Sequence, residues 1–336
     1  KVKALQAREE DAILKSLCDN LKKGPENIPA DFSDLIDLMK NMKLEGITAL
    51  HEKIMALTCS DKDTILSMFH DALPMVETDA SVRFMTNGIL NKPHEIPGEY
   101  WTRSLSLVRN PSLDMITAVL ENLVKQDNGA FVMASGLVKK YCQQNPMCDG
   151  DDAIMNFVNY AISVLDTCDK DITDSSFDKI LSSLRVLQNI GSNKAWDEKV
   201  FDGALKCVNP IPKQQILQGA AMMLLEQMNC GTLSKSSTRG IPDNLYKITE
   251  IFELYDFSNE ENKFYSHEAR IRAFRILIKC REISPVASFV NRVNDGAMYF
   301  DEQLAAYMSS YFTNLMQKTA ERSEERRVGK ECRSRW

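Results

Sequence analysis

Apolar residues recur at three- and four-residue steps along almost the whole chain, and this spacing is the feature that most limits how it can fold. Such a spacing places the apolar side chains on one face of an α-helix. We find no segment with the strict apolar–polar alternation of a half-buried strand. The sequence therefore predicts an all-α chain of about sixteen helices, each roughly 12–18 residues long.

Residues that favour the ends of helices flank several of these periodic segments. Ser60 or Asp61 is the expected N-cap of one helix, Ser112 is the expected N-cap of another, and Gly191 is expected to end a third. The apolar stripes expected for these helices and for one earlier helix are Phe32, Leu35, Ile36, Met39 and Met42; Ile65, Met68, Phe69 and Leu73; Leu113, Ile116, Leu120 and Leu123; and Phe177, Ile180, Leu184 and Leu187.

Short segments join these helices, so we expect consecutive helices to be antiparallel neighbours. Helix pairs that recur about every 35–45 residues are typical of an α-solenoid. A globular bundle is the alternative, but so many helices would need several cores, whereas a stack needs contacts only between neighbours. We therefore predict a right-handed α-superhelix of antiparallel helices in two layers, formed by a single domain over residues 1–320.

The last fifteen residues, RSEERRVGKECRSRW, interrupt the helical pattern. They are mostly charged, have no apolar period, and resemble a translated sequencing adapter. A solvated basic tail, such as an arm that binds nucleic acid, is the alternative. We expect residues 321–336 to be a non-native, disordered tail, and we leave Cys332 out of the cysteine count.

Composition and charge argue against several classes of function. The net charge of −6 repels nucleic acid, and no apolar run approaches the roughly 20 residues that span a bilayer. The four histidines are scattered, and the glycine motifs that hold phosphates are missing. We expect no enzyme activity, no cofactor, no metal site and no nucleic-acid partner. Because the chain starts at Lys1 without a signal-peptide pattern, we interpret it as a fragment.

One predicted helix near the end of the chain is basic. Its charged residues include Arg270, Arg272, Arg275, Lys279 and Arg281. These side chains are a candidate site for an acidic partner. The alternative is a solvated face or a face between domains, which the residues alone favour.

Cys142 and Cys148 lie on either side of Asn145-Pro146. A structural zinc site needs four ligands, and no second cysteine pair or nearby histidine completes this one. A redox pair has a two-residue spacer, which is shorter than the spacer here. A helix that ends near Cys142 and a turn at Asn145-Pro146 bring the two cysteines within disulfide range. We favour a disulfide, with free thiols as the alternative, and a disulfide indicates a secreted protein.

Several segments in order resemble a known family. These are ILSMFHDALPMVETDASVRFMTNGIL (65–90), then ASGLVKKYC, then ILSSLRVLQNIG, and then ALKCVNP after Gly191. Together they resemble the superhelical α-domain of the large lipid transfer proteins, which include vitellogenins, apolipophorins and apolipoprotein B. The resemblance covers about residues 1–320 and looks closest to apolipophorin and apolipoprotein B.

The resemblance implies a helical wall in the lipid-loading module of a secreted lipoprotein. The wall would support β-sheets, outside this sequence, that hold phospholipid and acylglycerol. The resemblance also suggests a disulfide between Cys168 and Cys207, which both follow predicted helix ends. Two buried free cysteines are the alternative, and Cys18, Cys59, Cys230 and Cys280 remain unassigned. The competing hypothesis for the whole chain is a cytosolic HEAT-like scaffold that binds proteins on its concave face, in which the thiols would stay reduced.

Overall fold

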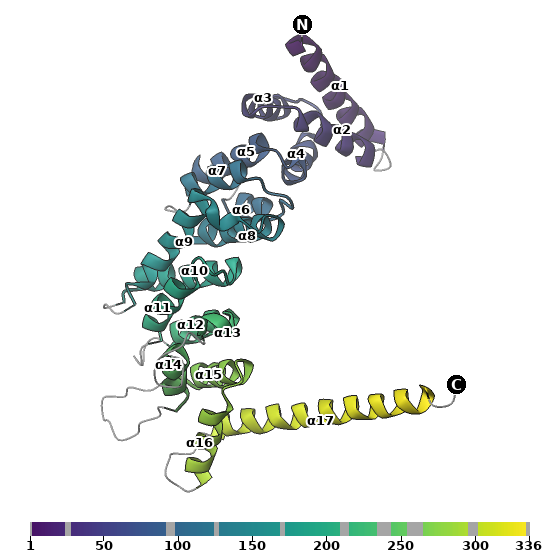
Figure 1. Cartoon of the computed structure of the whole chain (residues 1–336). Coiled ribbons are helices and arrows are strands. Elements are labelled where there is room, and N and C mark those ends of the chain that lie inside the picture. Colours follow the sequence, from purple (N-terminus) through teal and green to yellow (C-terminus); the bar gives the residue numbers. More distant parts are fainter. Residues whose placement is uncertain are drawn as a thin grey trace. The chain divides into compact units, whose positions relative to one another are not determined.

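A computed structural model describes residues 2–23, 28–91, 98–123, 128–168, 172–208, 215–233, 243–253, 265–294 and 302–333 (Figure 1). These residues form α-helices joined by short connections, and no strand occurs within these ranges. The prediction of an all-α chain is confirmed. The chain divides into two compact units, residues 1–196 and residues 197–336.

The helices of unit 1 are α1 (Val2–Lys23), α2 (Ile28–Lys40), α3 (Leu44–Met55), α4 (Lys62–Val76), α5 (Asp79–Asn91), α6 (Gly98–Ser106), α7 (Leu113–Leu123), α8 (Asn128–Gln144), the 3-10 helix η2 (Cys148–Gly150), α9 (Asp152–Leu165) and α10 (Asp174–Ile190). Unit 2 contains α11 (Asp197–Lys206), α12 (Gln215–Gln227), α13 (Cys230–Leu233), α14 (Asp243–Glu253), α15 (His267–Lys279), α16 (Ile283–Asn294) and α17 (Glu302–Arg333).

Unit 1 is built as two layers of helices. In one layer α3, α5, α7 and α9 pack in sequence, each against the next, and in the other α2, α4, α6, α8 and α10 do the same. Contacts between consecutive helices, such as α5 with α6 and α9 with α10, join the two layers. This is the two-layered stack that the short connections predicted, and we call the two layers the odd layer and the even layer.

Unit 2 is organised around α15. This helix packs against α12, α14, α16 and α17. The ring of Phe274 on α15 is fully buried and lies 5.5 Å from the ring of Tyr311 and 5.9 Å from that of Phe312 on α17. Buried Phe252 of α14 lies 6.3 Å from the same ring. A single aromatic cluster therefore holds three helices of unit 2 together.

The sequence signals for helix ends correspond to the observed caps. Asp61 occupies the N-cap position of α4, although its side chain makes no capping hydrogen bond. The hydroxyl of Ser112 accepts a hydrogen bond from the backbone N–H of Met115 at the start of α7. Gly191 ends α10 with a positive φ of 89°, a backbone conformation that glycine adopts without steric cost. Thr173 and Ser176 add a capping box at the start of α10, which the sequence analysis did not identify.

Two lysines link helices that pack against each other but are not consecutive in the chain. The ammonium of Lys140 on α8 donates to the carbonyls of Ser106 and Val108 at the carboxyl end of α6, at 2.8 and 2.6 Å. In unit 2, Lys279 on α15 donates in the same way to Glu226 O and Met228 O at the end of α12, both at 2.8 Å. Carbonyls in the last turn of a helix have no partner within it, so each lysine stabilises the end of an earlier helix. We call Lys140 and Lys279 the lysine clamps.

The C-terminal segment is part of α17. Residues 321–333 continue this helix up to Arg333, and the expectation that residues 321–336 form a disordered tail stays a prediction. Glu, Arg and Lys are good helix formers, and oppositely charged pairs four residues apart stabilise a helix without any packing. That residues 321–336 are non-native, and that residues 1–320 form one domain, stay predictions.

Candidate functional site

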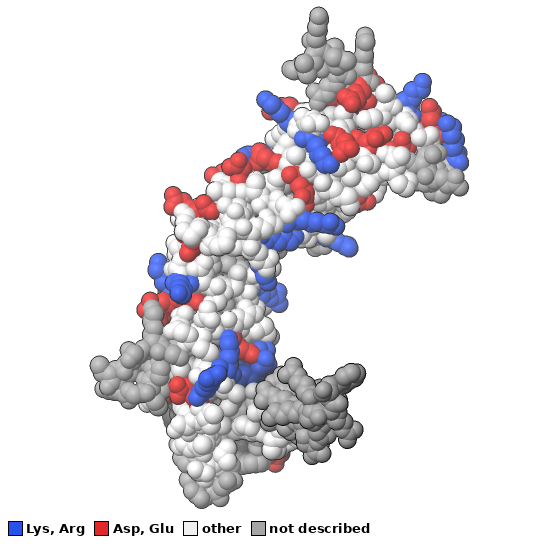
Figure 2. All heavy atoms as spheres, turned by 45° about the vertical axis from the view of Figure 1, so that its right-hand side comes forward, with Lys and Arg blue, Asp and Glu red and all other residues white. Residues whose placement is uncertain are grey.

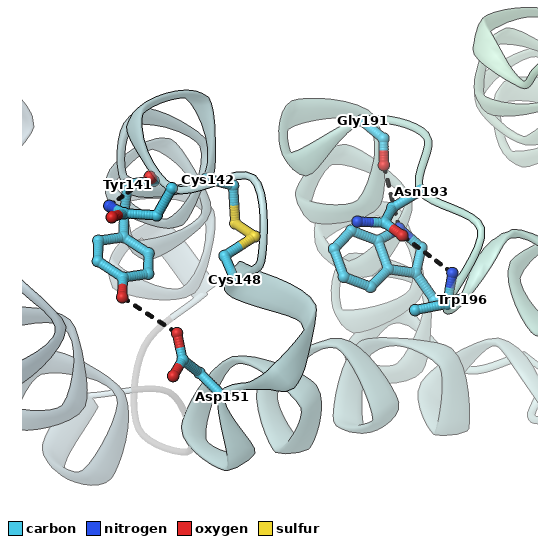
Figure 3. Close-up of a disulfide and its surroundings, with 9 residues drawn as sticks. Tyr141, Cys142, Cys148, Asp151, Gly191, Asn193 and Trp196 are labelled. Atoms are coloured by element: carbon cyan, nitrogen blue, oxygen red, sulfur yellow. Dashed lines mark hydrogen bonds between the residues drawn. A yellow bond between two sulfur atoms is a disulfide. The ribbon is translucent and has the colours of Figure 1, made fainter.

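The disulfide between Cys142 and Cys148 closes the connection from α8 to α9 (Figure 3). Its two Cα atoms are 5.3 Å apart, and Cys148 is buried. The hydroxyl of Tyr141 donates to a carboxylate oxygen of Asp151 at 3.1 Å across the same loop. Burial, together with this hydrogen bond, raises the pKa of Tyr141. The loop therefore fixes the position at which α9 begins and leaves no thiol for metal binding.

The segment that follows α10, residues 191–196 of unit 1, is held by hydrogen bonds instead of a disulfide (Figure 3). The indole N–H of Trp196 donates to the carbonyl oxygen of Gly191 at 3.1 Å. The side-chain oxygen of Asn193 accepts from the backbone N–H of Ala195 at 2.9 Å. A disulfide therefore holds the segment that follows α8, and hydrogen bonds hold the segment that follows α10.

Two further disulfides join cysteines that the sequence analysis left unassigned. Cys18 on α1 pairs with Cys59, which lies between α3 and α4, and the sequence separation is 41 residues. Cys230 at the start of α13 pairs with Cys280 at the end of α15, with a separation of 50 residues. Each disulfide links elements of a single unit that are distant along the chain.

Cys168 and Cys207 are each fully buried and each disulfide-bonded. Cys168 follows the end of α9 and Cys207 follows the end of α11, as the sequence analysis expected. Their pairing with each other stays a proposal, because the two residues belong to different units.

The predicted basic cluster is mostly used within unit 2. The guanidinium of Arg272 contacts Glu226 at 2.9 Å and Glu268 at 2.8 Å, and Arg275 contacts Glu226 as well. Lys279 is a lysine clamp. Four of the five predicted side chains therefore act in packing α15, because Arg270 is also bound internally, as described next.

Arg270 is not on a surface, contrary to the prediction of a basic face. Its side chain is fully buried, donates to the carbonyl of Phe252 at 3.1 Å and lies 5.7 Å from the ring centroid of Phe289. A buried guanidinium is tolerated when hydrogen bonds and an aromatic face replace water. Arg275, Lys279 and Arg281 are exposed, and Arg281 has a positive φ of 64° just beyond α15. An acidic partner at these residues stays a prediction.

A histidine and aromatic cluster fills the space between α3, α4, α5 and α6. His70 is buried, with its ring centroid 5.0 Å from that of Trp101 and 5.7 Å from that of His51. Burial, with a smaller effect of the neighbouring His51, lowers the pKa of His70 to about 4. Burial and a hydrogen bond to Asp71 raise the pKa of Tyr100 to about 12. His70 is therefore neutral at pH 7 and packs as a core residue.

Exposed apolar side chains mark the carboxyl ends of three helices of the even layer. Met75 lies in the last turn of α4, Leu107 directly follows α6 and Met147 lies three residues beyond α8; they are 55%, 59% and 80% exposed. Hydrogen bonds join the same ends: the backbone N–H of Arg109 donates to Glu77, and Gln144 donates to Asn110. We call Met75, Leu107 and Met147 the apolar rim of unit 1.

A groove of about 850 Å³ opens between α7 and α9 in the odd layer. Leu120, Phe157 and Tyr160 provide its apolar part, and Glu121 and Asp152 provide its carboxylates. The sequence analysis placed Leu113 and Leu120 on the buried stripe of α7, but both are only half-buried. Met115, Ala118 and Val119 are buried instead, so the helix is rotated relative to the prediction and Leu120 reaches the groove.

The described residues contain no group of three or more His, Cys, Asp or Glu side chains arranged to hold a metal ion. Among them, too, no helix is both long enough and apolar enough to cross a bilayer.

The sequence matches the protein family described as the vitellogenin TPR domain over residues 6–312. The chain belongs to the vitellogenin TPR domain family. This is the helical domain of the large lipid transfer protein superfamily, as the resemblance of segments such as 65–90 predicted. The family is not an enzyme family.

Known relatives of this vitellogenin TPR domain agree with the match. The chain is 18% identical to vitellogenin from Penaeus merguiensis over 330 residues, and this alignment covers 96% of the chain and 12% of the vitellogenin. Its fold is similar to that of a solved structure described as lipid–protein interactions in lipovitellin, with a TM-score of 0.56 at 16% identity. That similarity covers 85% of this chain and 28% of the lipovitellin chain, so the domain corresponds to a part of both relatives.

Proposed function

We propose that the chain forms the helical wall of the lipid-loading module of a secreted lipoprotein. The observation that carries this proposal is the family match, which extends over residues 6–312. The wall carries no reaction: its role is to support β-sheets elsewhere in the same protein while those sheets hold phospholipid and acylglycerol. An assignment to the apolipophorin or apolipoprotein B type is the finer part of the proposal.

The cysteines support the secreted part of this proposal. Eight of them are disulfide-bonded, including the pairs Cys18–Cys59, Cys142–Cys148 and Cys230–Cys280. Disulfides persist in oxidising compartments and are rare in the cytosol. The competing hypothesis of a cytosolic HEAT-like scaffold requires reduced thiols, so the oxidised cysteines count against it.

The apolar rim of unit 1 supports the proposal that this unit contacts an apolar partner. Single exposed apolar residues are normal on protein surfaces, but these three lie near the carboxyl ends of successive helices of one layer. Methionine side chains are flexible and adapt to irregular apolar partners. We assign Met75, Leu107 and Met147 to the contact between the wall and the lipid-holding part of the protein.

The purified 336-residue chain allows a test with detergent and lipid. We expect it to self-associate or to bind dodecyl maltoside, and to take up no defined number of lipids from phosphatidylcholine vesicles. The variant Met75→Gln/Leu107→Gln/Met147→Gln should lose most of the detergent binding. The matched control is Lys139→Gln/Lys179→Gln/Arg185→Gln, which changes three exposed charged residues of the even layer and should leave detergent binding intact.

Three results would contradict the proposal. A monodisperse monomer without detergent or lipid affinity would favour the scaffold hypothesis. Saturable binding of lipid at a fixed ratio would show that this chain itself contains the lipid cavity. Equal loss of detergent binding in the rim variant and in the control would contradict the proposal that the apolar rim contacts the lipid-holding part of the protein.

A further inference from the structure

The groove between α7 and α9 has walls of one charge sign. The charged residues of its lining are Glu121 on α7 and Asp152 on α9, and neither helix contains Lys or Arg. Both carboxylates are exposed. In Figure 2, acidic side chains gather along the left edge of the upper part of the molecule. A ligand for this groove should therefore be cationic.

The floor of the groove is apolar and held in place. Phe157 is 3% exposed, and its ring lies 5.2 Å from that of Phe131 in an edge-to-face arrangement. The ring of Tyr160 lies 5.5 Å from Phe131, also edge to face. Because both rings are fixed by the buried Phe131, the groove exists before a ligand arrives. A ligand should therefore carry an apolar part as well as positive charge.

The length of the groove distinguishes between kinds of cationic ligand. Its α9 wall extends from Asp152 to Ser163, and residues between them, including Asn156 and Tyr160, also line the groove. At a rise of 1.5 Å per residue this wall is about 16 Å long, or about three helical turns. A single amine headgroup would fill only part of that length. A helix of a polypeptide, lying along the groove, would contact all of it.

We propose that the groove between α7 and α9 docks an amphipathic helix of a partner polypeptide that has Lys or Arg residues beside its apolar stripe. The apolar stripe contacts Leu120, Phe157 and Tyr160, and the basic residues face Glu121 and Asp152 at the two walls. This docking site lies in the odd layer, whereas the apolar rim belongs to the even layer. The inference is therefore independent of the proposed lipid function.

The test measures binding of a labelled helical peptide to the full 336-residue chain. The probe is a fluorescein-labelled 15-residue peptide of leucine and lysine with leucines at helical spacing, followed by fluorescence anisotropy at low ionic strength. Exposed charges are screened by salt, so low ionic strength gives the largest effect. A leucine–glutamate peptide and a lysine–serine peptide of equal length test the roles of charge and of the apolar stripe. Hydrogen exchange then locates the bound peptide.

Variants of the chain separate the groove from the rest of the surface. We expect one saturable leucine–lysine peptide per chain, with added protection of amides in α7 and α9. Glu121→Gln/Asp152→Asn should raise the Kd about tenfold, since it removes both carboxylates of the lining and keeps their shape. Ala153→Arg, which places a long cation in the groove, should abolish binding. Asp178→Asn removes an exposed carboxylate from α10 and should leave the Kd unchanged. Circular dichroism confirms that each variant is folded.

Several results would overturn the proposal. Equal Kd values for the original chain, Glu121→Gln/Asp152→Asn and Ala153→Arg would place the peptide elsewhere. Equal binding of the lysine–serine peptide would show a diffuse charge effect. Competition by monomeric dihexanoylphosphatidylcholine would assign the groove to a lipid headgroup. A dimer that Ala153→Arg dissociates would assign it to a second copy of the chain.

Discussion

Gly88 lies inside α5 directly against the ring of Trp101, and replacing it with alanine tests how tightly this part of unit 1 is packed. A Cβ atom at Gly88 would lie 2.7 Å from Nε1 and 2.8 Å from Cε2 of the indole. Ordinary contact begins at 3.4 Å, so the ring would have to move by about 0.7 Å (3.4 − 2.7). Trp101 is only 2% exposed and packs against the rings of His70 and Phe84, so it has little room to move.

Two opposing effects decide the sign of the change in stability. Alanine in the interior of a helix is favoured over glycine by about 1 kcal/mol. Overpacking a well-packed core costs about 1–3 kcal/mol. Gly136 in α8 supplies the matched control, because a Cβ there would meet nothing within 4 Å. The helix preference cancels between the two variants, so Gly88→Ala should be less stable than Gly136→Ala by about 1–3 kcal/mol.

Urea unfolding followed by circular dichroism and tryptophan fluorescence measures this difference. Gly136→Ala should raise the unfolding midpoint above that of the original chain, and Gly88→Ala should not. Gly219→Ala is a useful third variant, because its Cβ would approach only the carboxylate of Glu268 at 2.9 Å, and that side chain can turn away. It should behave like Gly136→Ala. Equal stabilisation by all three variants would show that Trp101 moves freely and would refute the packing argument.

Four further predictions concern ionisable groups and disulfides. Burial lowers the pKa of His70 from 6.5 to about 4, so the unfolded chain binds the proton first and stability should fall by about 3 kcal/mol as the pH drops from 6.5 to 4. In His70→Gln the urea midpoint should change less over this pH range. If the midpoint of the variant changes as much as that of the original chain, the pH dependence comes from other groups such as His51. Lys140→Met should cost about 1–2 kcal/mol in urea unfolding by leaving carbonyls at the end of α6 without their donor, and no change would mean that water replaces the ammonium. Replacing Cys18 and Cys59 with serine should lower the free energy of unfolding by about 4 kcal/mol. Replacing Cys142 and Cys148 should lower it by about 2 kcal/mol, because that disulfide closes a shorter loop. The reverse order would argue against the chain-entropy model. Peptide mapping without reduction should recover Cys168 and Cys207 in one cross-linked peptide, and recovery of both as alkylated thiols would reject their pairing.

The helices and several of their ends could be predicted from the sequence because those signals are local. The 3.6-residue period depends only on which residues are apolar, and the caps at Asp61, Ser112 and Gly191 depend on a few neighbouring residues. The two-layered stack followed from short connections. The capping box at Thr173 could have been found as well, since it needs only a second hydroxyl three residues later.

What the sequence did not predict depends on contacts between distant segments. The basic residues of α15 suggest a charged surface, yet Arg270 finds its partners on α14 and α16, which no local pattern reveals. The pairing of Cys18 with Cys59 depends on where α1 lies relative to α3 and α4. Leu120 was predicted on the buried stripe of α7, but the packing of α7 against its neighbours leaves it half-buried beside the groove.

The lysine clamps have a consequence for how the stack carries charge. Consecutive helices are antiparallel, so helices of one layer point the same way and their dipoles lie side by side, which is a repulsive arrangement. The resulting negative edge is made of carbonyl groups that do not titrate, so a change of pH cannot discharge it. The ammonium groups of Lys140 and Lys279 supply a counter-charge at carbonyls 32 to 53 residues earlier in the chain. Each clamp thereby holds its helix in register with its predecessor, and the polarity of the layer becomes a source of cohesion.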